Sequence, residues 1–120
     1  MSSIRPVLLV GPEDFSRLVA ALRRHALGAL IAPDVQTALR MLRHFRVDVI
    51  LTTVTDTEDL ARLTTHNART PVVFMGVDPQ SARDAGCVGV IAEAAAPPVL
   101  ADLLHFVGSR ERSVQQTEVA

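Results

Sequence analysis

The stretch PVLLVGPEDF, from Pro6 to Phe15, decides the fold because a short apolar run ends abruptly at a Gly-Pro pair. The continuous apolar run Pro6–Val10 is typical of a strand buried on both faces of a parallel sheet. Helical periodicity follows, with Glu13 and Asp14 in a first turn where the helix dipole favours acids. Such a turn between a first strand and a helix often belongs to a nucleotide or phosphate site. Pro12, however, has no backbone N–H to donate to a phosphate, so the sequence raises the question of whether this loop is still active.

The same alternation of strand and helix continues along the chain. Asp34 is predicted to cap a second helix whose inward-facing residues are Val35, Ala38, Leu39, Leu42 and Phe45. Gly28 is predicted as the C-cap of the first helix. We predict strands at 6–10, 29–32, 47–53, 71–76 and 88–92, and helices at 13–27, from 34, at 57–67, at 78–85 and from 97 to 108. Five strands alternating with helices indicate an open parallel sheet covered on both sides.

Composition limits the classes of function. A chain of 120 residues with 48% apolar residues suits one globular domain, which we place at 1–108, with a polar tail or linker at 109–120. Aromatic residues make up only 3% and the net charge is −1, which argues against direct nucleic acid binding. The single Cys87 suits a reducing, cytoplasmic compartment. No apolar run reaches the roughly 20 residues of a membrane span.

Four stretches carry a resemblance to a known family in their hydrophobic pattern and connection lengths: VLLVGPEDF, ALRMLRHFRVDVILTTV, TPVVFMG and AGCVGVIAEAAAPPVLADLL. From Arg5 to about Val107 the chain resembles the receiver domain of bacterial response regulators. The resemblance implies a flavodoxin-like (CheY-like) α/β fold, with a doubly wound five-stranded parallel sheet in the order 2-1-3-4-5 and helices on both faces. The segment between strands four and five is about one turn short, which implies a shortened fourth helix.

The resemblance also locates the positions of the family's phosphorylation chemistry, and this chain departs from the family at all of them. Where the family has an acidic pair for Mg²⁺, this chain has Gly11 and Pro12. The phospho-accepting aspartate is replaced by Thr53, and the Ser or Thr after strand four by Gly76. The Lys-Pro pair after strand five is replaced by Glu93 and Ala94.

These replacements remove the chemistry together. Mg²⁺ prefers carboxylate oxygens, and an acyl phosphate needs a carboxylate, whereas Thr53 has a hydroxyl and, as far as the sequence indicates, no base nearby. Lysine is absent from the chain, and Glu93 would repel a phosphoryl group. We therefore predict a non-phosphorylatable pseudo-receiver, without catalysis, metal or cofactor, that acts as a protein–protein interaction or regulatory module in bacterial signal transduction.

Two alternatives remain beside this prediction. One is a small-molecule sensor that uses the crevice at the carboxyl ends of the strands, and the other is an enzyme, for which no motif is visible. Partners of the interaction module would be a second copy, another protein or a downstream output domain. The predicted contact face includes the short helix at Gln80–Ala85 and three apolar residues of the last helix, Val99, Leu103 and Phe106.

Other side chains with chemical potential have ordinary structural explanations as well. Glu13 and Asp14 either replace the missing acidic pair or simply open a helix. Thr52, Thr53 and Thr55 form either a small polar pocket and phosphorylation target or the end of a strand. Asp56 follows in the same loop, but it lies three residues beyond the phospho-acceptor position and is rejected as its replacement.

The remaining candidates are single or scattered. Cys87 is predicted to be a small buried apolar residue. The four histidines show no metal-ligand spacing: His25, His44, His66 and His105. Arginines on the second helix form a basic edge that either receives an acidic partner or is a solvated helix face: Arg40, Arg43 and Arg46.

Overall fold

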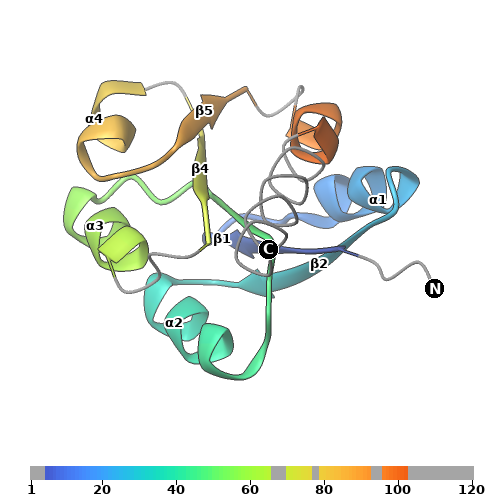
Figure 1. Cartoon of the computed structure of the whole chain (residues 1–120), viewed down its shortest axis with the longest axis horizontal. Helices are drawn as coiled ribbons and strands as arrows, with labels where there is room; N and C mark the ends of the chain where they lie inside the picture. The colour runs from blue at the N-terminus through green and yellow to red at the C-terminus, as the bar shows by residue number, and fades with distance from the viewer. Residues whose placement is uncertain (1–4, 66–69, 77–78, 93–95, 103–120) are drawn as a thin grey trace, which may run out of the picture.

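The computed structural model describes residues 5–65, 70–76, 79–92 and 96–102 of the chain. Strands and helices alternate along these ranges, as the apolar periodicity predicts (Figure 1). The elements are β1 (Arg5–Val10), α1 (Ser16–Arg24), β2 (Leu27–Ala32), α2 (Val35–His44), β3 (Val49–Thr52), α3 (Thr57–Thr65), β4 (Val72–Met75), α4 (Pro79–Asp84) and β5 (Gly89–Ile91). A further helical segment covers 96–102.

The five strands form one parallel sheet in the order β2-β1-β3-β4-β5, which confirms the predicted doubly wound, CheY-like flavodoxin fold. Strand β1 lies between β2 and β3 and aligns Val7 with Ala29 of β2 on one side and with Val49 of β3 on the other. All residues of β3 and β4 are buried. Unbroken apolar strands are stable here because both faces of the sheet are covered.

Helices cover the sheet in two layers with a separate apolar core in each. α1 and the helix at 96–102 lie on one face, where Leu22 and Leu100 pack against Val7 and Leu9 (Figure 1). On the other face α2, α3 and α4 pack against Leu8, Val10 and Ile50. Alternate residues of β1 therefore serve opposite cores, and burying each of these side chains contributes about 1.5–3 kcal/mol.

The start of α2 follows its capping residue. Asp34 caps α2 as predicted, because its carboxylate accepts a hydrogen bond from the Thr37 N–H at 2.7 Å. This bond lowers the pKa of the Asp34 carboxyl from its ordinary value of 3.8. α4 has only six residues, in agreement with the shortened fourth helix that was predicted.

Three local predictions are wrong. The first helix does not begin at Glu13: α1 starts at Ser16, so neither Glu13 nor Asp14 lies in its first turn. Gly28 is not the C-cap of the first helix: α1 ends at Arg24, Ala26 takes the left-handed φ of 60°, and Gly28 pairs with Pro6 inside β2. Starting the strand early buries Leu27, which outweighs the cost of about 1–2 kcal/mol for a left-handed alanine. Phe45 does not face inward either. It follows the end of α2 and is 52% exposed.

One corner of the molecule joins α3, α4 and β5 around the single cysteine. The Thr64 hydroxyl donates to the Ala85 carbonyl at 2.6 Å and so ties α3 to the end of α4. Cys87 follows this turn, is buried as predicted, and has a thiol pKa raised by that burial. Within the described ranges, no helix combines the length and apolar character needed to cross a bilayer.

Candidate functional site

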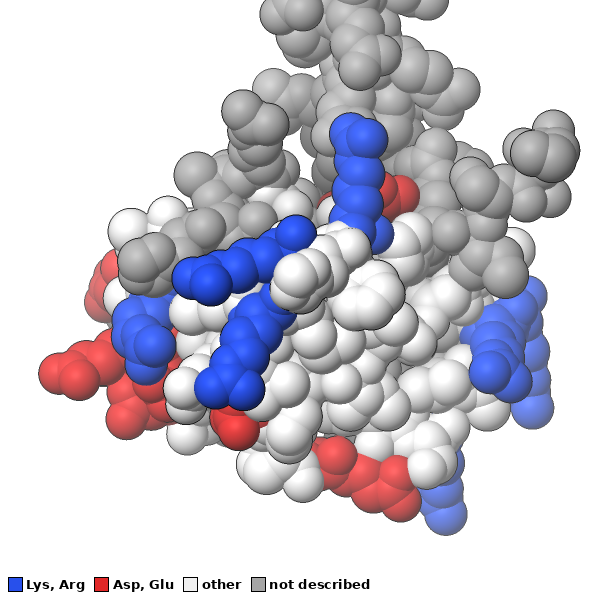
Figure 2. Space-filling view, turned by 90° about the horizontal axis from the view of Figure 1, so that it is seen from below, with Lys and Arg blue, Asp and Glu red and all other residues white. Residues whose placement is uncertain are grey.

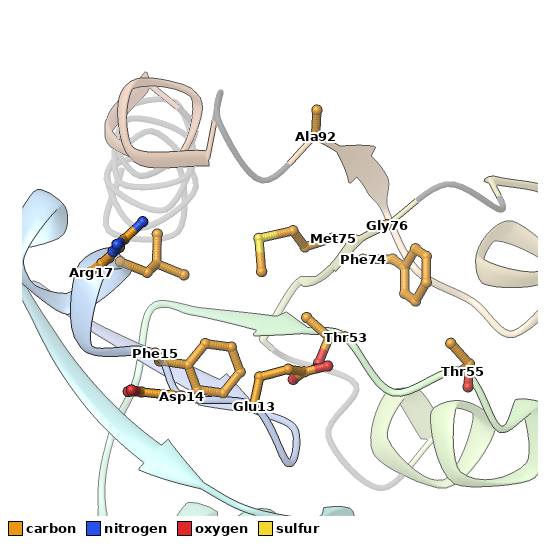
Figure 3. A pocket seen from close by; sticks show the side chains of 11 residues that line it. Glu13, Asp14, Phe15, Arg17, Thr53, Thr55, Phe74, Met75, Gly76 and Ala92 are labelled. Atoms are coloured by element: carbon orange, nitrogen blue, oxygen red, sulfur yellow. The ribbon is translucent and has the colours of Figure 1, made fainter.

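A crevice opens at the carboxyl ends of the strands, where ligands bind in open α/β sheets (Figure 3). Its volume is about 580 Å³, within the roughly 300–1,000 Å³ typical of small-molecule sites. Its lining comes from the end of β4, from residues that follow β1, β3, β4 and β5, and from the first turn of α1. The lining residues are Glu13, Asp14, Phe15, Arg17, Leu18, Thr53, Thr55, Phe74, Met75, Gly76 and Ala92.

Thr53 and Glu13 are joined at the centre of this crevice. The Thr53 hydroxyl donates a hydrogen bond to Glu13 Oε2, and Figure 3 shows the two side chains pointing toward each other. The prediction that Thr53 has no base nearby is therefore wrong. The physical reason is loop geometry: Glu13 lies two residues beyond Gly11, and the turn after β1 brings its side chain back over the end of β3.

Gly11 leaves the space for this hydrogen bond. Gly11 is buried, and a Cβ atom there would overlap Thr53 Oγ1 and lie 2.6 Å from Glu13 Oε2. The sequence singled out Gly11 only as the position of a lost acid. In the structure Gly11 also makes room for the Glu13–Thr53 hydrogen bond, because any larger residue at this position would displace the two side chains.

The two acids of the loop separate. Asp14 accepts hydrogen bonds from the backbone N–H and the hydroxyl of Ser16, which lower the pKa of its carboxyl from 3.8. Its side chain points away from Glu13 and Thr53 (Figure 3). Asp14 therefore serves the start of α1, whereas Glu13 belongs to the crevice. Arg17, the second residue of α1, brings a positive charge to the same lining.

The other predicted positions fall in different places. Gly76 lines the crevice, and the Phe74 ring packs so closely that a Cβ at Gly76 would meet it at 2.6 Å. Pro12 is exposed in the loop and is not among the lining residues. Glu93 and Ala94 lie outside the described residues, as do Leu103 and Phe106 of the predicted contact face. Val99 lies on the helix at 96–102 and is 38% exposed.

Two neighbouring candidates have structural roles. Thr52 is fully buried, donates to the Val10 carbonyl at 3.1 Å and accepts from the Val54 N–H at 3.1 Å. It holds β3 against β1 rather than facing a ligand. Asp56 caps α3 by accepting from the N–H groups of Glu58 and Asp59, which agrees with its rejection as a phospho-acceptor.

The donor set does not fit the Mg²⁺ site that a receiver fold implies. Mg²⁺ takes an octahedral shell of oxygen ligands that includes one or two carboxylates. Here Gly11 and Pro12 bring no side-chain oxygen, Asp14 is engaged with Ser16, and Glu13 is bonded to Thr53. Across the described ranges no three His, Cys, Asp or Glu side chains gather as a metal site would require.

Comparison with solved structures places the fold among receiver domains. The chain is similar to the signal receiver domain of an HD domain-containing protein from Pseudomonas fluorescens, with a TM-score of 0.75, 19% identity and coverage of 97% of this chain and 95% of that one. It is also similar to the chemotaxis response regulator CheY4 of Vibrio cholerae, with a TM-score of 0.65, 22% identity and coverage of 88% and 99%.

A third similar structure is a receiver domain recorded with a partner. It is the Saccharomyces cerevisiae receiver domain of Ssk1 in complex with the histidine phosphotransfer signalling protein Ypd1, with a TM-score of 0.70, 14% identity and coverage of 90% and 91%. No family model and no curated protein matches the sequence. The chain therefore has the receiver fold, established by structure and not by sequence identity.

Proposed function

We propose that this domain works in two-component signalling as a pseudo-receiver, a receiver-fold module whose state is not set by aspartyl phosphorylation. One observation carries the proposal. The end of β3, where the family resemblance places the phospho-accepting carboxylate, holds the Thr53 hydroxyl bonded to Glu13 across Gly11. An alcohol cannot form the acyl phosphate that receivers use.

The charges around the crevice support the same proposal. Glu13 brings a carboxylate to the centre of the crevice, and Asp14, although it is bonded to Ser16, adds a second one to the lining. Arg17 brings one guanidinium, so the formal charge of the lining residues is negative. A phosphoryl group carries about −1.5 to −2 charges at neutral pH and would be repelled there. The proposal therefore includes no phosphotransfer and no other catalysis.

The proposal is tested with beryllofluoride, which mimics a phosphoryl group on a carboxylate. We expect that Mg²⁺ with beryllofluoride leaves the thermal unfolding midpoint unchanged, and that small phosphodonors leave no label on the protein. The Thr53→Asp variant is the informative control, because it restores the acceptor without the acidic pair. It should also remain unlabelled. Saturable, Mg²⁺-dependent stabilisation of the wild type would refute the proposal.

If phosphorylation does not set its state, the domain acts through its surface. We propose a protein partner or a second copy, docked on the face that includes Val99, an exposed valine of the helix at 96–102. The sequence extends this proposed face to Leu103 and Phe106. Val99→Lys is expected to abolish capture of the partner without changing the unfolding midpoint. If the Val99→Lys variant still captures the partner, the docking surface does not include Val99.

A second candidate function is small-molecule sensing, which the size of the crevice favours. Phe15, Leu18 and Met75 give it an apolar wall, with Glu13 and Arg17 as polar groups. A ligand that binds the folded state raises the unfolding midpoint, so a thermal screen with a metabolite panel tests this function. Ala92→Trp would fill the crevice and should cancel any such shift, whereas Ala20→Trp, on the exposed side of α1, should not.

A further inference from the structure

The edge strand β2 has an unusual composition. It ends the strand order, and within the described ranges it pairs only with β1. Its six residues, LGALIA, include no charged residue and no proline. Natural edge strands usually carry such residues because exposed N–H and C=O groups otherwise invite another strand. The outer edge of β2 lacks this protection.

The surface around this strand is apolar. Ile31 is 49% exposed, and its neighbours Gly28, Ala29 and Leu30 are half-buried. Figure 2, seen from the side of α2 and β2, shows a broad uncharged area that is bordered by charged side chains. The blue side chains there are all arginines, because the chain contains no lysine.

Opposite charges stand at the two ends of β2. α1 ends with Arg23 and Arg24, both exposed, just before the strand begins at Leu27. The exposed Asp34 follows two residues after the strand ends at Ala32. The Asp34 carboxylate is ionised at neutral pH, as an exposed aspartate is. The edge is therefore positive at its start and negative at its end.

We propose that β2 is a self-association edge, on which two copies of this chain pair their β2 strands antiparallel about a twofold axis. Only the antiparallel arrangement puts Arg23 and Arg24 of each copy beside Asp34 of the other, at both ends of the joint. A parallel arrangement would set like charges together and would not close as a dimer. The two five-stranded sheets then become one continuous sheet.

This surface is separate from the face around Val99 and does not depend on the lost phosphorylation chemistry. A six-residue strand is only about 20 Å long, so the joint is short. We therefore expect a dimer that dissociates on dilution. Salt should also weaken it, because the exposed charge pairs at its ends are screened.

The first experiment is sedimentation velocity over a dilution series with two matched variants. Ile31→Lys puts a charge on the edge, near the arginines of the partner copy. Val88→Lys makes the same kind of change at a 64% exposed valine that is bonded to β4, away from β2. We expect Ile31→Lys to raise the dissociation constant at least about tenfold, and Val88→Lys to leave it unchanged.

A charge exchange tests the antiparallel arrangement itself. The double variant Arg23→Glu with Arg24→Glu should be monomeric, because its glutamates face Asp34 of the second copy. Adding Asp34→Lys to the same chain should restore the dimer by reversing both ends. Because Asp34 also caps α2, circular dichroism must show that each variant is folded. Asp34→Asn, which keeps the cap, gives an independent measurement and should weaken the dimer.

Three results would overturn the inference. If the wild type stays monomeric at every concentration of the dilution series, the protein does not self-associate and the inference is wrong. If Ile31→Lys leaves the dimer intact, the dimer interface lies elsewhere. The same conclusion follows if only Val99→Lys disrupts the dimer. In that last case the proposed pseudo-receiver function stands, while β2 is excluded as the dimer interface. A failure of this inference can therefore be told apart from a failure of the proposed function.

Discussion

At the scale of single residues, Gly11, Glu13 and Thr53 depend on one another. The hydrogen bond between Glu13 and Thr53 occupies the space that a side chain at position 11 would need. Sequence alone could predict that Gly11 and Thr53 follow strands β1 and β3, at positions where the family resemblance expects acidic residues. It could not predict their contact with Glu13, which joins positions 40 residues apart through the path of a loop.

We predict that Gly11→Ala lowers the free energy of unfolding by roughly 1–2 kcal/mol, as overpacking commonly does. The added Cβ must push Thr53 and Glu13 apart. Gly89→Ala is the control, since a Cβ there meets nothing within 4 Å, and its effect should stay within about 0.5 kcal/mol. Urea unfolding of both variants measures the difference.

A double-mutant cycle of Gly11→Ala and Thr53→Ala tests whether the two positions depend on each other. Thr53→Ala alone should cost less than about 1 kcal/mol, the size of one ordinary hydrogen bond. Gly11→Ala should then be less harmful in the Thr53→Ala background, because the hydroxyl that the new Cβ would overlap is gone. Strictly additive effects would mean that Gly11 is needed for a reason other than this contact.

At the scale of elements, the start of α2 could be predicted, whereas the bounds of α1 each differ from the prediction by three residues. Asp34 carries its capping signal in its own side chain, so the start of α2 follows from the sequence. The end of α1 depends instead on whether Leu27 reaches the core, which no residue near Gly28 signals. Phe45 fits the helical period of α2, yet the helix ends just before it and leaves the ring exposed.

The cap of α2 predicts a response to acid. The pKa of Asp34 is lowered in the folded protein because its carboxylate accepts the Thr37 N–H. Its contribution to stability is therefore complete above the ordinary value of 3.8 and is lost as the pH falls through the lower folded value. Asp34→Asn keeps the cap without the titration, so its unfolding midpoint should fall less steeply below about pH 4.

Thermal unfolding at a series of pH values makes this comparison. Gln36→Ser, an uncharged change at an exposed position of the same helix, should keep the acid slope of the wild type. Equal slopes for Asp34→Asn and the wild type would show that the cap does not carry this pH dependence.

At the scale of the whole molecule, the sheet and its two layers could be predicted because apolar periodicity is repeated in every strand and helix. Val49–Thr52 and Val72–Met75 are buried throughout, and such continuous apolar runs suit only the inside of a parallel sheet. The strand order came from the family resemblance, since periodicity does not tell which strands are neighbours. The place of the crevice follows from the parallel sheet, but its lining, like the exposed edge at Ile31, depends on packing in three dimensions and had no signal in sequence.

The corner that holds Cys87 contains a built-in probe of local opening, because the rate at which its thiol is labelled reports how often the corner opens. Its buried thiol, the only one in the chain, meets a thiol reagent in solution when this corner opens. The rate of labelling under native conditions therefore counts how often this corner opens. Thr64→Val removes the bond to Ala85 while keeping the shape of the side chain. If that bond is worth about 1 kcal/mol, labelling should speed up about fivefold. Thr65→Val, at the exposed next position, should leave the rate as it was.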